Sequence, residues 1–170
     1  VLVVSSTMIA QLSLNGLGFM YLWPNAPGWN VMAVPFLASI CCLFVLLFTK
    51  EFLDTNRLLP LFKYVATGLM SLHVLTMVML FISHYTALNL MLFSTISTFV
   101  AVIVVAIISY RRGVREARFF LLGWFIFLTG VCITILERAA VIPYSIFTEY
   151  AGQGALSLEV VLLSLALADK

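Results

Sequence analysis

The chain has 170 residues, of which 64% are hydrophobic, 14% are aromatic and 9% are charged. A soluble domain carries about 25% charged residues, because its surface must face water. Residues 1–49 and 64–110 contain no Asp, Glu, Lys or Arg, and apolar runs beyond about 18 residues are typical of membrane-spanning helices. The composition therefore excludes a soluble globular protein and predicts an integral membrane protein, and nothing in its charge pattern indicates nucleic-acid binding.

The apolar runs predict an all-α bundle of six transmembrane helices in a single domain, 1–170. A turn at Trp23-Pro24-Asn25-Ala26-Pro27-Gly28 ends the first span, because a helix cannot cross it. A single helix over 64–110 would be about 70 Å long, more than twice a bilayer core, so it must fold back near Ser83-His84-Tyr85-Thr86. The expected spans lie at about residues 1–21, 31–49, 61–83, 88–109, 119–140 and 147–168.

Eight cationic residues fall on one side of this arrangement: Lys50, Arg57, Lys63, Arg111, Arg112, Arg115, Arg118 and Lys170. Cationic loops stay on the cytoplasmic side, so both ends of the chain are expected there. Arg138 lies toward the other side, and Trp23 and Trp29 are expected at the outer interface, where aromatic rings prefer to sit. Val1 is not an initiator Met and no secretory signal precedes the spans, so we expect a piece of a longer protein.

Several short sequence patterns occur one after another along the whole chain, and their order and spacing are similar to those of one family. They are Gly16-Leu17-Gly18-Phe19, Tyr21-Leu22-Trp23-Pro24, Phe48, Phe52-Leu53, Leu59-Pro60, Arg112-Gly113, Ala117-Arg118-Phe119-Phe120-Leu121, Trp124, Thr148-Glu149-Tyr150, Leu158-Glu159-Val160 and Leu165-Ala166-Leu167-Ala168-Asp169. The chain resembles the membrane module of the bacterial seven-transmembrane receptors with diverse intracellular signalling modules. The family has seven spans, so the resemblance implies that the first helix is absent here.

The resemblance implies a signal-relay module in the bacterial inner membrane. It would couple a periplasmic sensory domain to a cytoplasmic effector, such as the histidine kinase of a two-component system or a diguanylate cyclase. Both domains would belong to the longer polypeptide of which this chain is expected to be a piece. The resemblance also implies homodimers. A small transporter or channel subunit is the alternative. Such a protein is expected to have an inverted repeat or broken helices near the membrane midplane, but no inverted repeat is evident and Pro35 lies near an expected helix start. A purely structural membrane anchor is a third possibility.

Glu159 is the most informative residue for function, because an ionised carboxylate in mid-membrane costs several kcal/mol unless it is paired. Gly152, Ala155, Glu159 and Ala166 share one stripe of the last expected helix, and small residues let helices approach closely in lipid. The stripe therefore predicts a helix–helix seam. Glu159 would be a neutral carboxyl that fixes packing, with a switching role in signal transfer and proton translocation as the alternatives.

Three further polar residues lie within expected spans. Glu137 and Arg138 near an outer helix end either snorkel to the interface or contact a sensory domain or ligand. His73 is expected to be a hydrogen-bonded interior group, with a proton relay as the alternative. His73 and His84, placed on the same expected span, are about 16 Å apart along a helix, too far to share a metal ion.

The turn formed by Trp23, Pro24, Asn25 and Trp29 is expected to be rigid and outward, either meeting a sensory domain or serving as a simple tight turn. No phosphate loop, zinc-protease motif or nucleophile elbow occurs. Cys41, Cys42 and Cys132 lack metal or redox spacing and are expected to be packing residues. We therefore expect no catalytic residues, no cofactor and no metal site in this segment.

Overall fold

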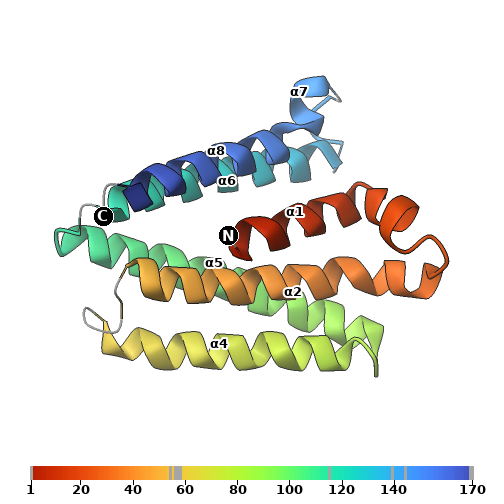
Figure 1. Ribbon diagram of the computed structural model, residues 1–170, viewed down its shortest axis with the longest axis horizontal. Coiled ribbons are helices and arrows are strands. Elements are labelled where there is room, and N and C mark those ends of the chain that lie inside the picture. Colours follow the sequence, from red (N-terminus) through yellow and green to blue (C-terminus); the bar gives the residue numbers. More distant parts are fainter. Residues whose placement is uncertain are drawn as a thin grey trace. The chain divides into compact units, whose positions relative to one another are not determined.

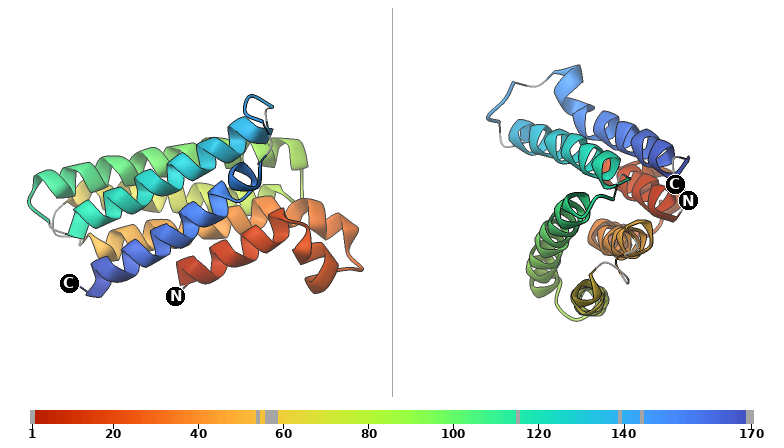
Figure 2. Two further views of the ribbon diagram at one scale, coloured as in Figure 1. Left: turned by 90° about the horizontal axis from the view of Figure 1, so that it is seen from above. Right: turned by 90° about the vertical axis from the view of Figure 1, so that its left-hand side faces the viewer.

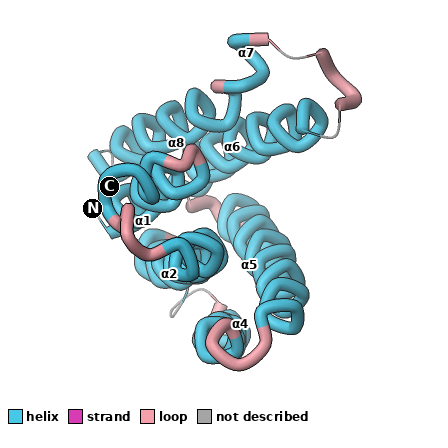
Figure 3. The backbone as a smooth tube through the Cα atoms, turned by 90° about the vertical axis from the view of Figure 1, so that its right-hand side faces the viewer, coloured by secondary structure: helices cyan, strands magenta, loops and turns pink. Residues whose placement is uncertain are grey.

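The computed structural model describes residues 2–53, 55, 59–114, 116–138, 140–143 and 145–168. Throughout this part of the chain the regular structure is helical and no strand occurs (Figure 3). In lipid a helix satisfies its backbone hydrogen bonds internally, so long apolar runs between short polar turns form helices. The chain is an all-α membrane helical bundle.

The first of two compact units is Val1–Val105. It contains α1 (Leu2–Leu14), the π-helical turn η1 (Gly18–Leu22), α2 (Pro27–Phe52), α4 (Pro60–Met79) and most of α5 (His84–Arg111). Within this unit α1 packs on α2 and α2 packs on α4, and successive helices run in opposite directions (Figure 1).

The segment expected as one helix over 1–21 is divided. α1 ends at Leu14, Gly16 takes a left-handed conformation with φ of 75°, and the chain then resumes as η1. α1 alone covers about 20 Å, less than a bilayer core of about 30 Å. Gly16 permits this break because it has no Cβ, and the apolar pattern that continues across it does not reveal the break.

α2 begins at Pro27, earlier than the expected residue 31, because proline at the first helical position has a φ suited to a helix and needs no hydrogen-bond partner. Pro35 consequently lies inside α2 rather than near its start. It cannot donate to the carbonyl one turn earlier. The buried Ser39 hydroxyl donates to the Pro35 carbonyl at 2.9 Å.

The break between α4 and α5 lies at residues 80–83, slightly before the expected segment. Ser83 and Thr86 share a hydroxyl–hydroxyl hydrogen bond of 3.0 Å. His84 is the first residue of α5 and His73 lies in α4, so the expectation that the two histidines share one helix is wrong. A polar pair at the turn therefore starts the new helix one turn earlier than hydropathy suggests.

The second unit, Ala106–Lys170, contains the end of α5, α6 (Glu116–Arg138), α7 (Ile146–Glu149) and α8 (Ala151–Ala168). α6 and α8 lie side by side along most of their length (Figure 2). The last expected span, 147–168, is divided at Tyr150 into α7 and α8. Ser145 caps α7 by accepting from the Thr148 N–H at 3.2 Å.

Four helices within the described residues are long and apolar enough to cross a membrane: α2, α4, α5 and the 117–134 part of α6. Residues 2–14 and 151–164 form shorter apolar helices. The total of six spans stays a prediction.

Candidate functional site

Small residues bring α6 and α8 close together along a seam, defined here as Gly123, Gly130, Thr134, Gly152, Ala155 and Glu159. A Cβ added to Gly130 would overlap the Ala155 Cβ and lie 2.8 Å from the Ala151 carbonyl oxygen. A Cβ on Gly152 would lie 3.0 Å from the Thr134 hydroxyl oxygen. In lipid, helix association depends on such close van der Waals packing.

Glu159 lies in the same seam and is only 8% exposed. A Cβ on Gly123 would lie 3.5 Å from the Glu159 Cγ and 3.8 Å from its Cα, which is ordinary van der Waals contact. Within the described part of the chain, no hydrogen bond or ion pair reaches the Glu159 carboxyl. Because an unpaired charge is expensive at such a position, the geometry favours a neutral carboxyl.

The start of α6 carries an apolar face. Ala117, Phe120 and Trp124 are 0%, 0% and 3% exposed and recur at i, i+3 and i+7, which places them on one side of a helix. The Phe120 and Trp124 ring centroids are 6.0 Å apart. Ala117, Phe120 and Trp124, which belong to the family-like motifs, therefore form a packing face of α6 near Gly123.

In the first unit, His73 of α4 faces two hydroxyl groups of α5. Its Nε2 lies 3.0 Å from the Thr98 hydroxyl oxygen, and its Nδ1 lies 3.4 Å from the Ser94 hydroxyl oxygen. His73, Ser94 and Thr98 are each 0% exposed. His73 is therefore a buried hydrogen-bonded group.

The turn between η1 and α2 is held by aromatic contacts. The Trp23 Nε1–H donates to the Asn30 side-chain oxygen at 3.3 Å. Trp23 and Trp29 pack edge to face with ring centroids 6.5 Å apart, and a Cβ on Gly18 would lie 2.8 Å from the Trp23 ring. Pro24 and Asn25 at the tip are exposed, so the turn has a packed base and an open tip.

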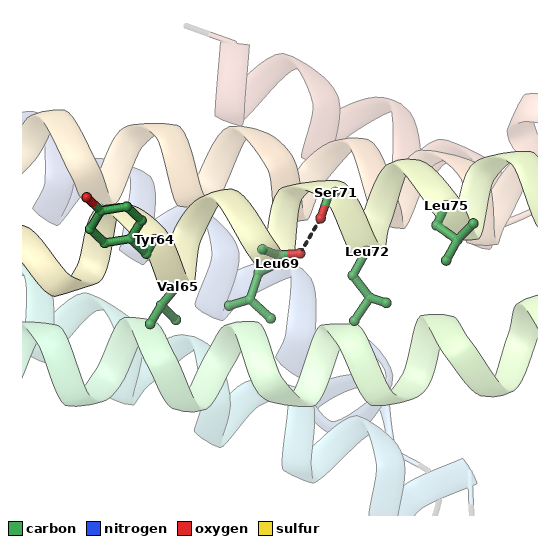
Figure 4. Close-up of a pocket in the computed structure, with 7 residues that line it drawn as sticks. Tyr64, Val65, Leu69, Ser71, Leu72 and Leu75 are labelled. Atoms are coloured by element: carbon green, nitrogen blue, oxygen red, sulfur yellow. Dashed lines mark hydrogen bonds between the residues drawn. The ribbon is translucent and has the colours of Figure 1, made fainter.

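An open groove of about 590 Å³ lies along α4 (Figure 4). It is lined mainly by apolar side chains, and the Ser71 hydroxyl donates to the Gly68 carbonyl of the same helix at 2.8 Å. Among the described residues, no group of three or more His, Cys, Asp and Glu side chains could hold a metal ion. The side chains that line the groove include Tyr64 and Ser71 but no His, Cys, Asp or Glu.

The family described as "7TM diverse intracellular signalling" matches residues 1–170, the whole chain. The chain belongs to this family. As a member, it is a transmembrane receptor module linked to intracellular signalling. No curated protein and no solved structure matches the chain.

Within this 7TM signalling module, the predicted stripe residues Gly152, Ala155 and Glu159 lie against α6. Glu137 is half-buried near the end of α6. The side chains of Arg138 and Ala166 lie outside the described residues. The functional roles assigned to these residues stay predictions.

The sequence predicted that Gly152, Ala155 and Glu159 share one helix face, but it did not predict that this face packs on Gly123, Gly130 and Thr134 of α6. It also missed Ser94 and Thr98 as partners of His73. Their i, i+4 spacing within an apolar helix is a usable signal, because it puts two hydroxyls on one face.

Proposed function

We propose that this receptor module relays a signal from a periplasmic sensory domain to a cytoplasmic effector such as a histidine kinase or a diguanylate cyclase, across the bacterial inner membrane. The observation that supports the proposal is the α6–α8 seam, in which Glu159 is buried beside Gly123. Burying a polar group between close-packed membrane helices costs free energy, and such groups in transmembrane segments commonly have a function.

The relay would act by moving α8 relative to α6. The contact of Gly130 with Ala151 and Ala155 leaves no space for compression, so displacement of one helix must shift or turn the other. Packed interfaces respond by exchanging between discrete arrangements. The Glu159 carboxyl would favour the arrangement in which its proton finds an acceptor, so a small free-energy difference would select the signalling state.

The test uses the full-length receptor with Glu159→Gln and Glu159→Leu. Gln keeps the size and a hydrogen-bond donor, so expression and basal effector output should remain near those of the parent. Leu favours the membrane and should permit insertion while locking or uncoupling output. Ser157→Leu is the control, because Ser157 is exposed on the same helix. Effector activity in membranes, as phosphate incorporation or cyclic dinucleotide synthesis, is the measurement.

The outcomes separate the roles of Glu159. Loss of signalling in Glu159→Gln with retention in Glu159→Leu contradicts the neutral-carboxyl mechanism. Wild-type behaviour of both variants reduces Glu159 to a packing residue. Ion flux through the purified module in proteoliposomes would instead favour the transporter alternative.

We also propose that both ends of the module face the cytoplasm and that the receptor acts as a homodimer. Lys50, Lys63, Arg111 and Arg112 support the orientation through the cytoplasmic preference of cationic loops. The dimer follows from the effectors proposed, which generally work in pairs. Cross-linking of the full-length receptor in native membranes tests it, and a receptor that stays monomeric while signalling contradicts it.

A further inference from the structure

The two ring nitrogens of His73 each meet one hydroxyl group on the facing helix. Thr98 lies 3.0 Å from Nε2 and Ser94 lies 3.4 Å from Nδ1. A neutral imidazole has one N–H donor and one acceptor nitrogen. The direction of each hydrogen bond therefore decides which nitrogen carries the proton.

The Ser94 hydroxyl decides the direction. Its single hydrogen is directed to the Met91 carbonyl oxygen, at 3.0 Å, a shorter contact than the one to His73. Ser94 must then accept from His73, so Nδ1 carries the proton, and the Thr98 hydroxyl donates to the lone pair of Nε2. We infer that His73 is a neutral imidazole, protonated on Nδ1, that fixes the axial register of α4 against α5.

The opposite tautomer is less well satisfied. With the proton on Nε2, the Nδ1 lone pair would face an oxygen whose hydrogen is already used, and a buried acceptor without a donor is unfavourable. A doubly protonated ring would need a counterion. Residues 64–110, which include most of α4 and nearly all of α5, contain no Asp or Glu, and neither do residues 1–49.

The arrangement holds the two helices in one register. Ser94 and Thr98 are four residues apart on α5 and therefore lie on the same helix face, one turn apart. Sliding α4 by one turn, about 5.4 Å, would leave the ring beside at most one of the two hydroxyls, so a ring nitrogen and a buried hydroxyl would lose their partner. His73 is accordingly a positioning residue, and this conclusion does not depend on the relay proposed above.

The experiment is ¹⁵N NMR of the imidazole ring in the intact chain in lipid bilayers. The sequence has two histidines, so His84→Gln leaves His73 as the sole imidazole. We expect a protonated Nδ1 and an unprotonated Nε2. Thr98→Val should shift the Nε2 resonance, and Ser94→Ala should shift the Nδ1 resonance.

Thr76→Val is the matched control. Thr76 is also 0% exposed, lies one turn from His73, and donates to the Leu72 carbonyl of its own helix at 2.9 Å, so both ring signals should stay in place. A protonated Nε2 in the His84→Gln chain overturns the inference. This measurement leaves His73, Ser94 and Thr98 unchanged. Ring signals unaffected by either hydroxyl deletion overturn it as well.

Discussion

Glu159 lies directly against the backbone of α6 at Gly123, where an added Cβ would be 3.5 Å from the Glu159 Cγ. Further along the same two helices, an added Cβ on Gly130 would overlap Ala155. The seam is therefore tightest at Gly130 and has room for a methyl group beside Glu159. This difference makes the two glycines unequal, although both occupy the same face of α6.

The first prediction follows from that difference. Gly130→Ala should lower the free energy of unfolding by about 1–3 kcal/mol, because overpacking forces backbone shifts. Gly123→Ala should stay close to the parent, because the new methyl meets only ordinary contacts. Gly154→Ala on α8 is the control, since no atom lies within 4 Å of its added Cβ. Unfolding in mixed micelles with increasing denaturing detergent measures all three, and equal stability of Gly130→Ala and Gly123→Ala would contradict the seam geometry.

The second prediction concerns the turn after α5. Gly113 has φ of 86°, and its N–H donates to the Tyr110 carbonyl at 3.0 Å while the Val114 N–H donates to Ser109 at 3.2 Å. These two bonds form a Schellman motif, which needs a left-handed residue. Gly113→Ala should lower the unfolding free energy by about 1–2 kcal/mol.

Gly113→Asn provides the comparison for that change, because asparagine tolerates the left-handed region better than alanine. It should retain more of the parent stability in the same detergent titration. A stability order with alanine above asparagine would contradict the assigned turn.

The third prediction concerns the outer turn. A cysteine at Asn25 should react with membrane-impermeant thiol reagents in intact spheroplasts, because Asn25 is exposed at the tip and the Trp23–Asn30 hydrogen bond holds the base of the turn. The parent chain, which keeps Cys41, Cys42 and Cys132, measures the background reaction. Labelling that appears only after the cells are lysed would place this turn on the cytoplasmic side.

The fourth prediction is the full topology. Reporter fusions after Gly28, Thr86 and Tyr144 should read as periplasmic, and fusions after Thr55 and Gly113 should read as cytoplasmic, because the cationic residues gather in the latter loops. Alkaline phosphatase and green fluorescent protein fusions give opposite signals and control for each other. A cytoplasmic signal at Gly28 would overturn the count of six spans.

Local sequence features predicted some elements better than others. Helix α5 covers the expected span 88–109, because a long apolar run without breakers has one stable form in lipid. The division of 1–21 was missed, since Gly16 adopts a left-handed conformation that its apolar neighbours do not signal. The early start of α2 was missed too, because Pro27 was interpreted as part of the turn although proline suits a helix start.

By itself, the sequence determined the membrane class, the all-helical architecture and the family, because these depend on composition, hydropathy and the order of short motifs. Helical periodicity also placed Glu159 among small residues on one face. The tertiary structure decided which face meets which: Glu159 with Gly123, Gly130 with Ala155, and His73 with Ser94 and Thr98. The physical reason is that a 3.6-residue period defines the faces of one helix, whereas the partner and the register depend on side-chain packing and hydrogen bonds between residues far apart in the chain.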